Sequence, residues 1–255
     1  MKIDIQGLTK TYRKTGRREY TVLSDITFSI GRGDFVIVLG ESGCGKTTLL
    51  NLIAGFEKPS SGAVYADGEM VDRVHPSRLM LFQRPALIPW LNVKQNVAYG
   101  CRLRGDLEDL EYRVNQFLEI MGLLRFAESK PEELSMGMAH RACLAMALVG
   151  HPRALLLDEP FAALDTFTQT HIQEELVNLW QSEQFTAVFV THDIDEAIFL
   201  GNRIVLLGGD PTGVKEVLEI DDEYPRNKNS ARFKEIRADI LERFKKSYLA
   251  KRGIM

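Results

Sequence analysis

The chain opens with two stretches in which apolar and polar residues alternate, "KIDIQGL" at 2–8 and "YTVLSDITFSI" at 20–30. Such alternation places the apolar side chains on one face of a β-strand. A polar, basic break, "RKTGRRE" at 13–19, separates the two stretches. The pattern therefore predicts two antiparallel strands joined by a loop.

Several later runs are continuously apolar, which is typical of strands buried on both faces. These runs are "DFVIVLG" (34–40), "RLMLFQ" (78–83), "ALLLD" (154–158), "TAVFVTHD" (186–193) and "RIVLLGG" (203–209). Helical spacing follows the first of them in "KTTLLNLIAGF" (46–56) and separates the third and fourth in "QTHIQEELVNLWQSE" (169–183). Alternation of strand, helix and strand predicts a parallel sheet covered by helices.

Three further segments complete the predicted architecture. "SGAVYADGEMV" indicates a hairpin with Asp67-Gly68 in its turn, and residues 93–148 have the spacing of a helix-rich insertion. From Asp221 the chain is charged, with apolar residues spaced as in one amphipathic helix docked on the sheet domain. Those apolar residues are Phe233, Ile236, Ile240, Leu241 and Phe244.

Composition narrows the classes of function. The 255 residues are 45% hydrophobic and 26% charged, which suits one large domain, or one domain with a subdomain. A net charge of −3 argues against a nucleic-acid partner, since such proteins are usually basic. The sequence contains no run of about 18 apolar residues, so no membrane-spanning helix is predicted. The first residues, "MKIDIQGLTKTY", lack the apolar core of a signal peptide. Three cysteines without a CxxC pair fit a reducing cytoplasm better than a disulfide scaffold.

The segment "GESGCGKTT" matches the phosphate-loop pattern G-x-x-x-x-G-K-[ST] between a predicted strand and a predicted helix. Glycines at 40, 43 and 45 let successive N–H groups converge on phosphate oxygens, and the helix N-terminus adds to the attraction. Lys46 can reach the outer phosphates, and the Thr47 hydroxyl can ligate Mg²⁺. The predicted nucleotide-binding residues here are Gly40, Glu41, Ser42, Gly43, Cys44, Gly45, Lys46, Thr47 and Thr48.

The strand "ALLLDEP" supplies a second chemical element. Asp158 ends a buried strand, the edge at which ligands bind in open α/β sheets, and is predicted to hold the hydration shell of Mg²⁺. Glu159 follows directly and is placed to accept a proton from a water that attacks the γ-phosphate. Alone this motif would be weak, but beside a phosphate loop it predicts nucleotide hydrolysis.

With these motifs in this order, the chain resembles the ATP-binding cassette (ABC) family over residues 1–215. The resemblance implies an α/β P-loop NTPase core with a mixed or parallel sheet, an N-terminal antiparallel β subdomain and a helical insertion. It also implies that Tyr12 stacks on adenine, that Gln83 in "LFQ" senses the γ-phosphate and contributes to the metal site, and that His192 in "VTHD" contacts the γ-phosphate. Tyr12 could instead be an ordinary strand aromatic, with Tyr20 as the alternative stacker.

The expected organisation is a nucleotide-binding domain over 1–220, with a helical subdomain at about 90–150, and a basic helical extension over 221–255. The other histidines, His75, His140, His151 and His171, show no metal-ligand spacing and are interpreted as surface or packing residues.

In the ABC family two cassettes pack head to tail, and each signature motif closes over the ATP of the other. The signature here is "LSMGM". By resemblance, Ser135 and Gly137 contact the partner's nucleotide, and Asp165 in "AALD" touches the opposite subunit.

Met136 stands where the family has the first of two glycines, and Ala139 and His140 replace a usual Arg and Gln. If the backbone there needs a positive φ, a side chain costs about 1–2 kcal/mol. The alternative is that Met136 merely packs on an ordinary backbone. The first case predicts an asymmetric pair, in which a different cassette supplies the better signature.

A finer resemblance follows Gln83. "FQRPALIPWLNVKQNV" (82–97) and the ending "YPRNKNSARFKEIRADILERF" are similar to the nitrate/sulfonate/taurine branch of bacterial importers. This implies an ATPase motor with ATP and Mg²⁺, a second cassette, two transmembrane permease subunits and, indirectly, a periplasmic or lipoprotein solute-binding protein. It also implies a peripheral location on the cytoplasmic face of the inner membrane. Two alternatives remain open: a low-turnover regulatory cassette and a non-transport soluble ABC ATPase.

Overall fold

The computed structural model describes residues 1–13, 19–161 and 164–251, with side chains described as far as Phe244. Most of the predicted basic loop at 13–19 lies outside these ranges, as do Ala162, Ala163 and the end of the predicted extension. The chain divides into two compact units, which are described separately. One unit comprises residues 1–75 and 184–255, and the other comprises residues 76–183.

The first unit contains an antiparallel sheet with the strand order β2-β1-β4-β5. Its strands are β1 (Ile3–Tyr12), β2 (Tyr20–Ile30), β4 (Ser61–Ala66) and β5 (Glu69–Met70). The alternating pattern is confirmed, because Ile3, Ile5 and Leu8 are each at most 1% exposed. The turn between β4 and β5 is the predicted Asp67-Gly68 pair, with φ values of 49° and 88° that suit a tight hairpin turn.

Four more strands of this unit are ordered β10-β9-β3-β8. They are β3 (Phe35–Leu39), β8 (Thr186–Thr191), β9 (Arg203–Gly208) and β10 (Gly213–Glu219). β3 pairs in parallel with β8 and β9, whereas β10 pairs antiparallel with β9, so the sheet is mixed. Every residue of β3 and β8 is buried, as their continuous apolar pattern predicts. Helix α1 (Lys46–Ala54) follows β3.

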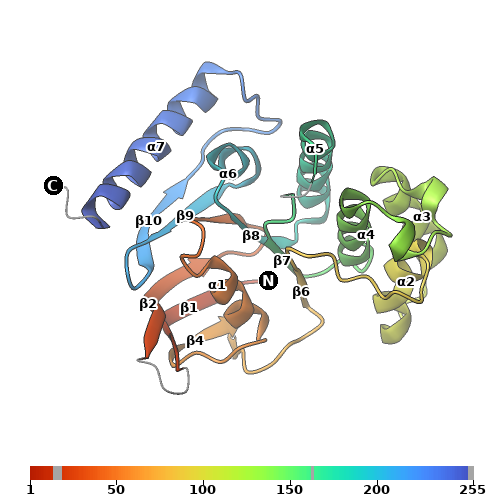
Figure 1. Cartoon of the computed structure of the whole chain (residues 1–255), viewed down its shortest axis with the longest axis horizontal. Helices are drawn as coiled ribbons and strands as arrows, with labels where there is room; N and C mark the ends of the chain where they lie inside the picture. The colour runs from red at the N-terminus through yellow and green to blue at the C-terminus, as the bar shows by residue number, and fades with distance from the viewer. Residues whose placement is uncertain (14–18, 162–163, 252–255) are drawn as a thin grey trace. The chain divides into compact units, whose positions relative to one another are not determined.

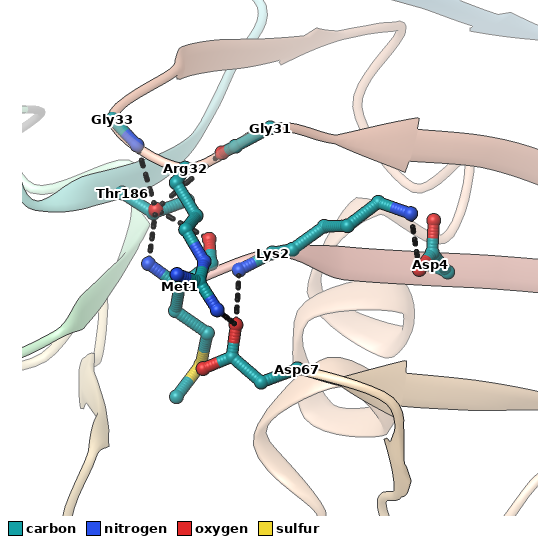
Figure 2. A network of polar contacts seen from close by, with 8 residues as sticks. All are labelled: Met1, Lys2, Asp4, Gly31, Arg32, Gly33, Asp67 and Thr186. Carbon is teal, nitrogen blue, oxygen red and sulfur yellow. Dashed lines mark hydrogen bonds and ion pairs between the residues drawn. The ribbon is translucent and has the colours of Figure 1, made fainter.

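A polar network holds the beginnings of these strands together (Figure 2). Thr186, which is fully buried, accepts hydrogen bonds from the amino group of Met1 at 3.0 Å and from the Gly33 backbone N–H at 3.1 Å. The Asp67 carboxylate accepts one bond from the Lys2 backbone N–H and one from the Arg32 guanidinium. The network joins the loop before β3, the hairpin turn of β4–β5 and the first residue of β8.

The C-terminal part of the first unit is clamped by a buried arginine. The Arg226 guanidinium, 5% exposed, donates to backbone carbonyls of Ile198, Gly201 and Ile220. The bonds to Ile198 and Gly201 satisfy carbonyls at the end of α6 (Ile194–Leu200), which no intrahelical donor can reach, and the bond to Ile220 ties the segment after β10 to the same arginine. Helix α7 (Ala231–Lys251) then packs on α6 and runs beside β9 and β10 (Figure 1). The predicted amphipathic helix is present, and Phe233 and Ile240 are each 1% exposed.

The second unit contains a parallel strand pair and the predicted group of helices. β6 (Arg78–Leu81) pairs with β7 (Ala154–Asp158), and three longer helices lie between them in the sequence. Helix α4 contacts α2, α3 and β6 and therefore lies at the centre of this group (Figure 1). The helical elements are α2 (Val93–Arg104), α3 (Leu110–Ile120), the short turns η1 (Leu124–Phe126) and η2 (Pro131–Glu133), α4 (Met136–Leu148) and α5 (Thr166–Glu183).

The described part of the chain contains no helix that is both long enough and apolar enough to cross a membrane.

Candidate active site

The phosphate loop joins β3 to α1 in the first unit. Gly43 and Gly45 have φ values of 78° and 98°, in the region that favours glycine. A Cβ added to Gly45 would lie 2.6 Å from a side-chain carbon of Val22, so space as well as backbone angle requires glycine there. Gly45 is the N-cap of α1, and its conformation turns the first N–H groups of the helix toward the loop. This is the geometry of an anion-binding helix N-terminus.

Lys46 begins α1 and is 5% exposed. Its Nζ donates hydrogen bonds of 2.9 Å to the carbonyl oxygens of Gly40 and Glu41. These bonds bring the ammonium group back over the loop that precedes the helix. A fixed positive charge therefore lies beside the backbone N–H groups that would receive a phosphate.

Tyr12, the predicted adenine-stacking residue, ends β1 and is 37% exposed. Its hydroxyl donates to Glu57 at 2.6 Å, and the ammonium group of Lys10 lies 4.9 Å from its ring centroid. Burial and the Glu57 carboxylate raise the pKa of this hydroxyl. Tyr20, the alternative stacker, is directly opposite Tyr12 in the β1–β2 pairing. Both candidate aromatics are thus at the same end of the antiparallel sheet, and Glu57 fixes the orientation of Tyr12.

His192 lies exposed between β8 and α6, also in the first unit. Its two neighbours fix the backbone there. The Thr191 hydroxyl donates to Glu196 at 2.6 Å and accepts from the Asp193 backbone N–H, and both Thr191 and Glu196 are buried. Asp193 caps α6 by accepting from the N–H groups of Asp195 and Glu196. The turn that carries His192 is therefore held on both sides.

Asp158 and Glu159 belong to the second unit. Asp158 is the last residue of β7 and is 4% exposed. Glu159 follows with φ of 45°, a left-handed conformation that few residues other than glycine adopt. Such conformations persist where the surroundings hold them, and they are common at functional sites.

Gln83 lies exposed two residues beyond the end of β6, in the loop that leads to α2. Fully buried Asn96 holds the later part of this loop, because its side chain exchanges hydrogen bonds with the backbone N–H and C=O of Ile88 and also donates to Leu91 O. The loop presents the indole of Trp90, which is 75% exposed. Asn96 thus gives an irregular loop a defined shape.

The signature segment "LSMGM" forms the beginning of α4. Ser135 is the N-cap, with its Oγ accepting from the Met138 backbone N–H at 3.3 Å. Met136 is the first helical residue, and its side chain is 60% exposed. The condition for backbone strain is therefore not met: Met136 has a helical conformation, not a positive φ. The second interpretation, an ordinary backbone, is correct, although the exposed side chain does not pack in a core.

Asp165 caps α5 through its Oδ1, which accepts from the Thr168 N–H at 3.0 Å. This bond and others at the helix start lower the pKa of the carboxyl group. Ala162 and Ala163 of the predicted "AALD" loop lie outside the described residues. A contact of Asp165 with another subunit stays a prediction.

Predicted site residues thus occur in both units. Tyr12, the phosphate loop and His192 belong to the first, and Gln83, Ser135, Gly137, Asp158, Glu159 and Asp165 belong to the second. Sequence reasoning missed three supporting residues: Glu57 bonds to Tyr12 itself, whereas Glu196 and His140 bond to chain neighbours of His192 and Glu159. The phosphate loop at residues 40–48 is a strong local signal. The contacts of Glu57 and His140 instead join residues 45 and 20 positions apart, and Glu196 belongs to a helix too short to show a helical pattern.

Comparison with known proteins assigns the family. The sequence model described as "ABC transporter" matches residues 23–162. The chain is 42% identical over 254 residues to the aliphatic sulfonates import ATP-binding protein SsuB of Bacillus cereus, covering 100% of both chains. It is 40% identical to the nitrate import ATP-binding protein NrtD of Synechococcus elongatus, covering 89% of this chain and 86% of the relative.

Among solved structures, the chain is similar to the ATP-binding cassette MJ0796 in a dimeric post-hydrolysis state bound to ADP and Pi. The TM-score is 0.78 and the sequence identity 31%, over 87% of this chain and 100% of the other. The phosphate loop, the Asp-Glu pair that ends β7 and the similarity along the whole chain all lead to one assignment: the protein belongs to the ABC transporter family and is one of its ATP-hydrolysing cassettes.

Proposed function

We propose that this chain is the ATP-hydrolysing motor subunit of a bacterial importer for a small anion or organic solute of the nitrate, sulfonate, taurine or bicarbonate type. The observation that carries the proposal is the end-to-end similarity to import ATP-binding proteins, 42% identical to one that serves aliphatic sulfonates. The phosphate-loop geometry supports the ATP-dependent part, because left-handed Gly43 and Gly45 turn the helix N-terminus toward an anion.

In this proposal the loop residues 40–48 bind the phosphates through backbone N–H groups, and Lys46 adds a point charge. Tyr12 stacks on adenine. Glu159 accepts a proton from the water that attacks the γ-phosphate, and His192 contacts the γ-phosphate oxygens. General-base assistance of this kind is worth about 10²–10⁴ in rate.

Mg²⁺ is proposed as the metal cofactor. No cluster of three or more His, Cys, Asp or Glu side chains that could hold a metal occurs among residues 1–13, 19–161 and 164–251. A nucleotide-bound Mg²⁺ does not need one, since phosphates and water supply most of its octahedral ligands. The exposed Thr47 hydroxyl and the Asp158 carboxylate are suitable donors, with Gln83 as a further contact. When bound, the ion neutralises charge on the phosphates.

The partners are proposed from the resemblance. A second cassette would receive Ser135, Gly137 and Asp165 at its own nucleotide, and two permease subunits would bring the assembly to the cytoplasmic face of the inner membrane. A periplasmic or lipoprotein solute-binding protein would act indirectly. Residues 1–220 would form the nucleotide-binding domain, with a helical subdomain at about 90–150, and residues 221–255 would form the C-terminal extension.

The test compares ATP hydrolysis by the full chain with that of the Glu159→Gln variant. Loss of turnover with retained ATP binding supports the motor, because the amide cannot accept the proton. Equal, very low turnover in both proteins would favour a regulatory cassette. Purification with membrane proteins, followed by uptake assays for sulfonates, nitrate and bicarbonate, separates an importer from a soluble ABC ATPase, which would purify without membrane partners.

We also propose that the pair of cassettes is asymmetric. The backbone at Met136 is ordinary, so the remaining obstacle is its exposed side chain at the place where the signature would meet the partner's ATP. Met136→Gly should raise ATPase activity of the assembled complex by up to about tenfold, equivalent to about 1.4 kcal/mol. An unchanged or lower rate would contradict the asymmetry. Mass spectrometry of the purified complex gives an independent answer, since a homodimer would also contradict it.

A further inference from the structure

His140 has an unusual position in the second unit. It belongs to α4, two residues after the signature segment, and is 3% exposed. A buried imidazole needs a hydrogen-bond partner, and here the partner is a backbone carbonyl beside the proposed general base. Its Nδ1 lies 3.1 Å from the backbone carbonyl oxygen of Pro160, which directly follows Glu159. Because a carbonyl can only accept, Nδ1 carries the hydrogen and donates.

The turn that receives this bond is conformationally demanding. Glu159 has φ of 45°, and the residue after it is a proline. Pro160 has no backbone N–H, so its carbonyl is the one backbone hydrogen-bonding group that can anchor the chain at that residue. His140 binds that group. The next residue, Phe161, is 2% exposed, so the turn is held at successive positions by a hydrogen bond and by burial.

We propose that His140 is a positioning residue for hydrolysis: it holds the left-handed turn that aims the Glu159 carboxylate. It does not touch the nucleotide and acts through the Pro160 carbonyl. This inference rests on the proposed role of Glu159 as general base. A base displaced by about 1 Å loses most of its advantage, so loss of the bond should lower kcat by about 10- to 100-fold.

Two substitutions separate the hydrogen bond from the space that the ring fills. His140→Asn retains a side-chain N–H donor at the position of Nδ1. His140→Leu fills a similar volume without a donor. We expect His140→Leu to lower kcat while KM for ATP changes by less than about twofold, and His140→Asn to recover most of the rate. Both are measured with the full chain in the complex with which it purifies.

Leu148→Ala provides a matched control. Leu148 lies two turns further along α4 and is 3% exposed, so its truncation loosens the same helix without removing the bond to Pro160. Measured below its melting temperature, this variant should be less stable but retain kcat. If Leu148→Ala loses kcat as His140→Leu does, or if Asn fails to rescue, then His140 has a structural role only and the proposal is overturned.

A double variant decides whether His140 acts through Glu159. If it does, His140→Leu has no further effect in a Glu159→Gln background, because the base is already absent. An additional loss of similar size would overturn the proposal. If Glu159→Gln alone retains full activity, the proposed role of Glu159 fails. If Glu159→Gln is inactive and His140→Leu is normal, the role of Glu159 stands and the inference about His140 alone fails.

Discussion

Two helix N-termini in this protein carry predicted phosphate contacts, and they are built in opposite ways. Helix α1 begins after Gly45, which has φ of 98° and provides no side-chain cap. Helix α4 begins after Ser135, which has an extended backbone and caps the helix through its hydroxyl. In α1 the backbone itself is unusual, whereas in α4 an ordinary backbone is closed by a side chain.

The difference explains why position 45 of this chain requires glycine whereas position 136 accepts methionine. At Gly45 a side chain would meet both an unfavourable φ and atoms of Val22. At Met136 a side chain extends into the surroundings and is 60% exposed. A glycine in a sequence motif therefore has to be judged by the backbone angle and the space at its own position.

Gly45→Ala is the variant with the largest expected effect, because it tests directly whether position 45 requires glycine. The left-handed backbone costs about 1–2 kcal/mol for a residue with a Cβ, and the overlap with Val22 adds about 1–3 kcal/mol. Because ATP binding has to restore the native loop, at 1.4 kcal/mol per decade ATP affinity should fall by about 30-fold or more, as measured by titration calorimetry. The control is Gly68→Ala, which also has positive φ but where an added Cβ meets nothing within 4 Å. That variant should lose stability and retain ATP affinity.

Ser135→Ala tests the other kind of N-terminus. Removing an N-cap costs about 1 kcal/mol, which lowers the melting temperature by about 2–4 °C in a protein of this size. Ser135→Asn keeps a capping oxygen and should remain close to the native melting temperature. If the alanine variant melts like the native protein, the hydroxyl is not a stabilising cap.

Met136→Gly sharpens the contrast, because glycine is the favourable residue at position 45 and an unfavourable one at position 136. Glycine in a helical conformation loses more backbone entropy on folding, so stability should fall by about 0.5–1 kcal/mol in urea unfolding. An increase in stability would mean that the side chain or the backbone is strained at this position. Met136→Ala keeps helix propensity and should cost less.

The smallest effect expected concerns pH. Burial lowers the pKa of His140 in the folded protein, against a weaker opposite effect of the bond to Pro160. The unfolded chain takes up a proton near its ordinary pKa of about 6.5, whereas the folded protein does so at lower pH. The contribution that neutral His140 makes to stability is therefore fully present above about pH 6.5, and it is lost as the pH falls toward the pKa of His140 in the folded protein. Denaturation at pH 7.5 and 5.5 should show a larger acid loss for the native protein than for His140→Asn.

Much of the fold was predictable because its signals are local. The alternation in β1 and β2 and the continuous apolar runs of β3, β7, β8 and β9 predict strands, and Phe233 with Ile240 marks the docked face of α7. Helix α6 was missed, since its seven residues are too few to show a helical period. β10 was missed as well, because as the outer strand of its sheet it has no buried run.

The site residues divide in the same way. The phosphate loop and Asp158-Glu159 are contiguous motifs, and the sequence indicated them directly. His140 was interpreted as a surface or packing residue, since its partner is a backbone carbonyl 20 residues away, and no pattern of side chains predicts such a contact. The prediction of backbone strain at Met136 was wrong for a related reason. The backbone angle there depends on where the helix begins, and the residue types do not determine that position.

The length of one helical turn has a further consequence. Met136 and His140 are four residues apart in α4, so they lie on the same face and about 6 Å apart along the axis. If His140 holds Glu159 and Ser135 meets a partner's nucleotide, both as proposed, α4 would couple the two cassettes mechanically. A displacement of its tip by a partner's nucleotide would shift the imidazole and so the turn that aims the base. Each cassette would then hydrolyse its ATP only while the other cassette also holds a nucleotide.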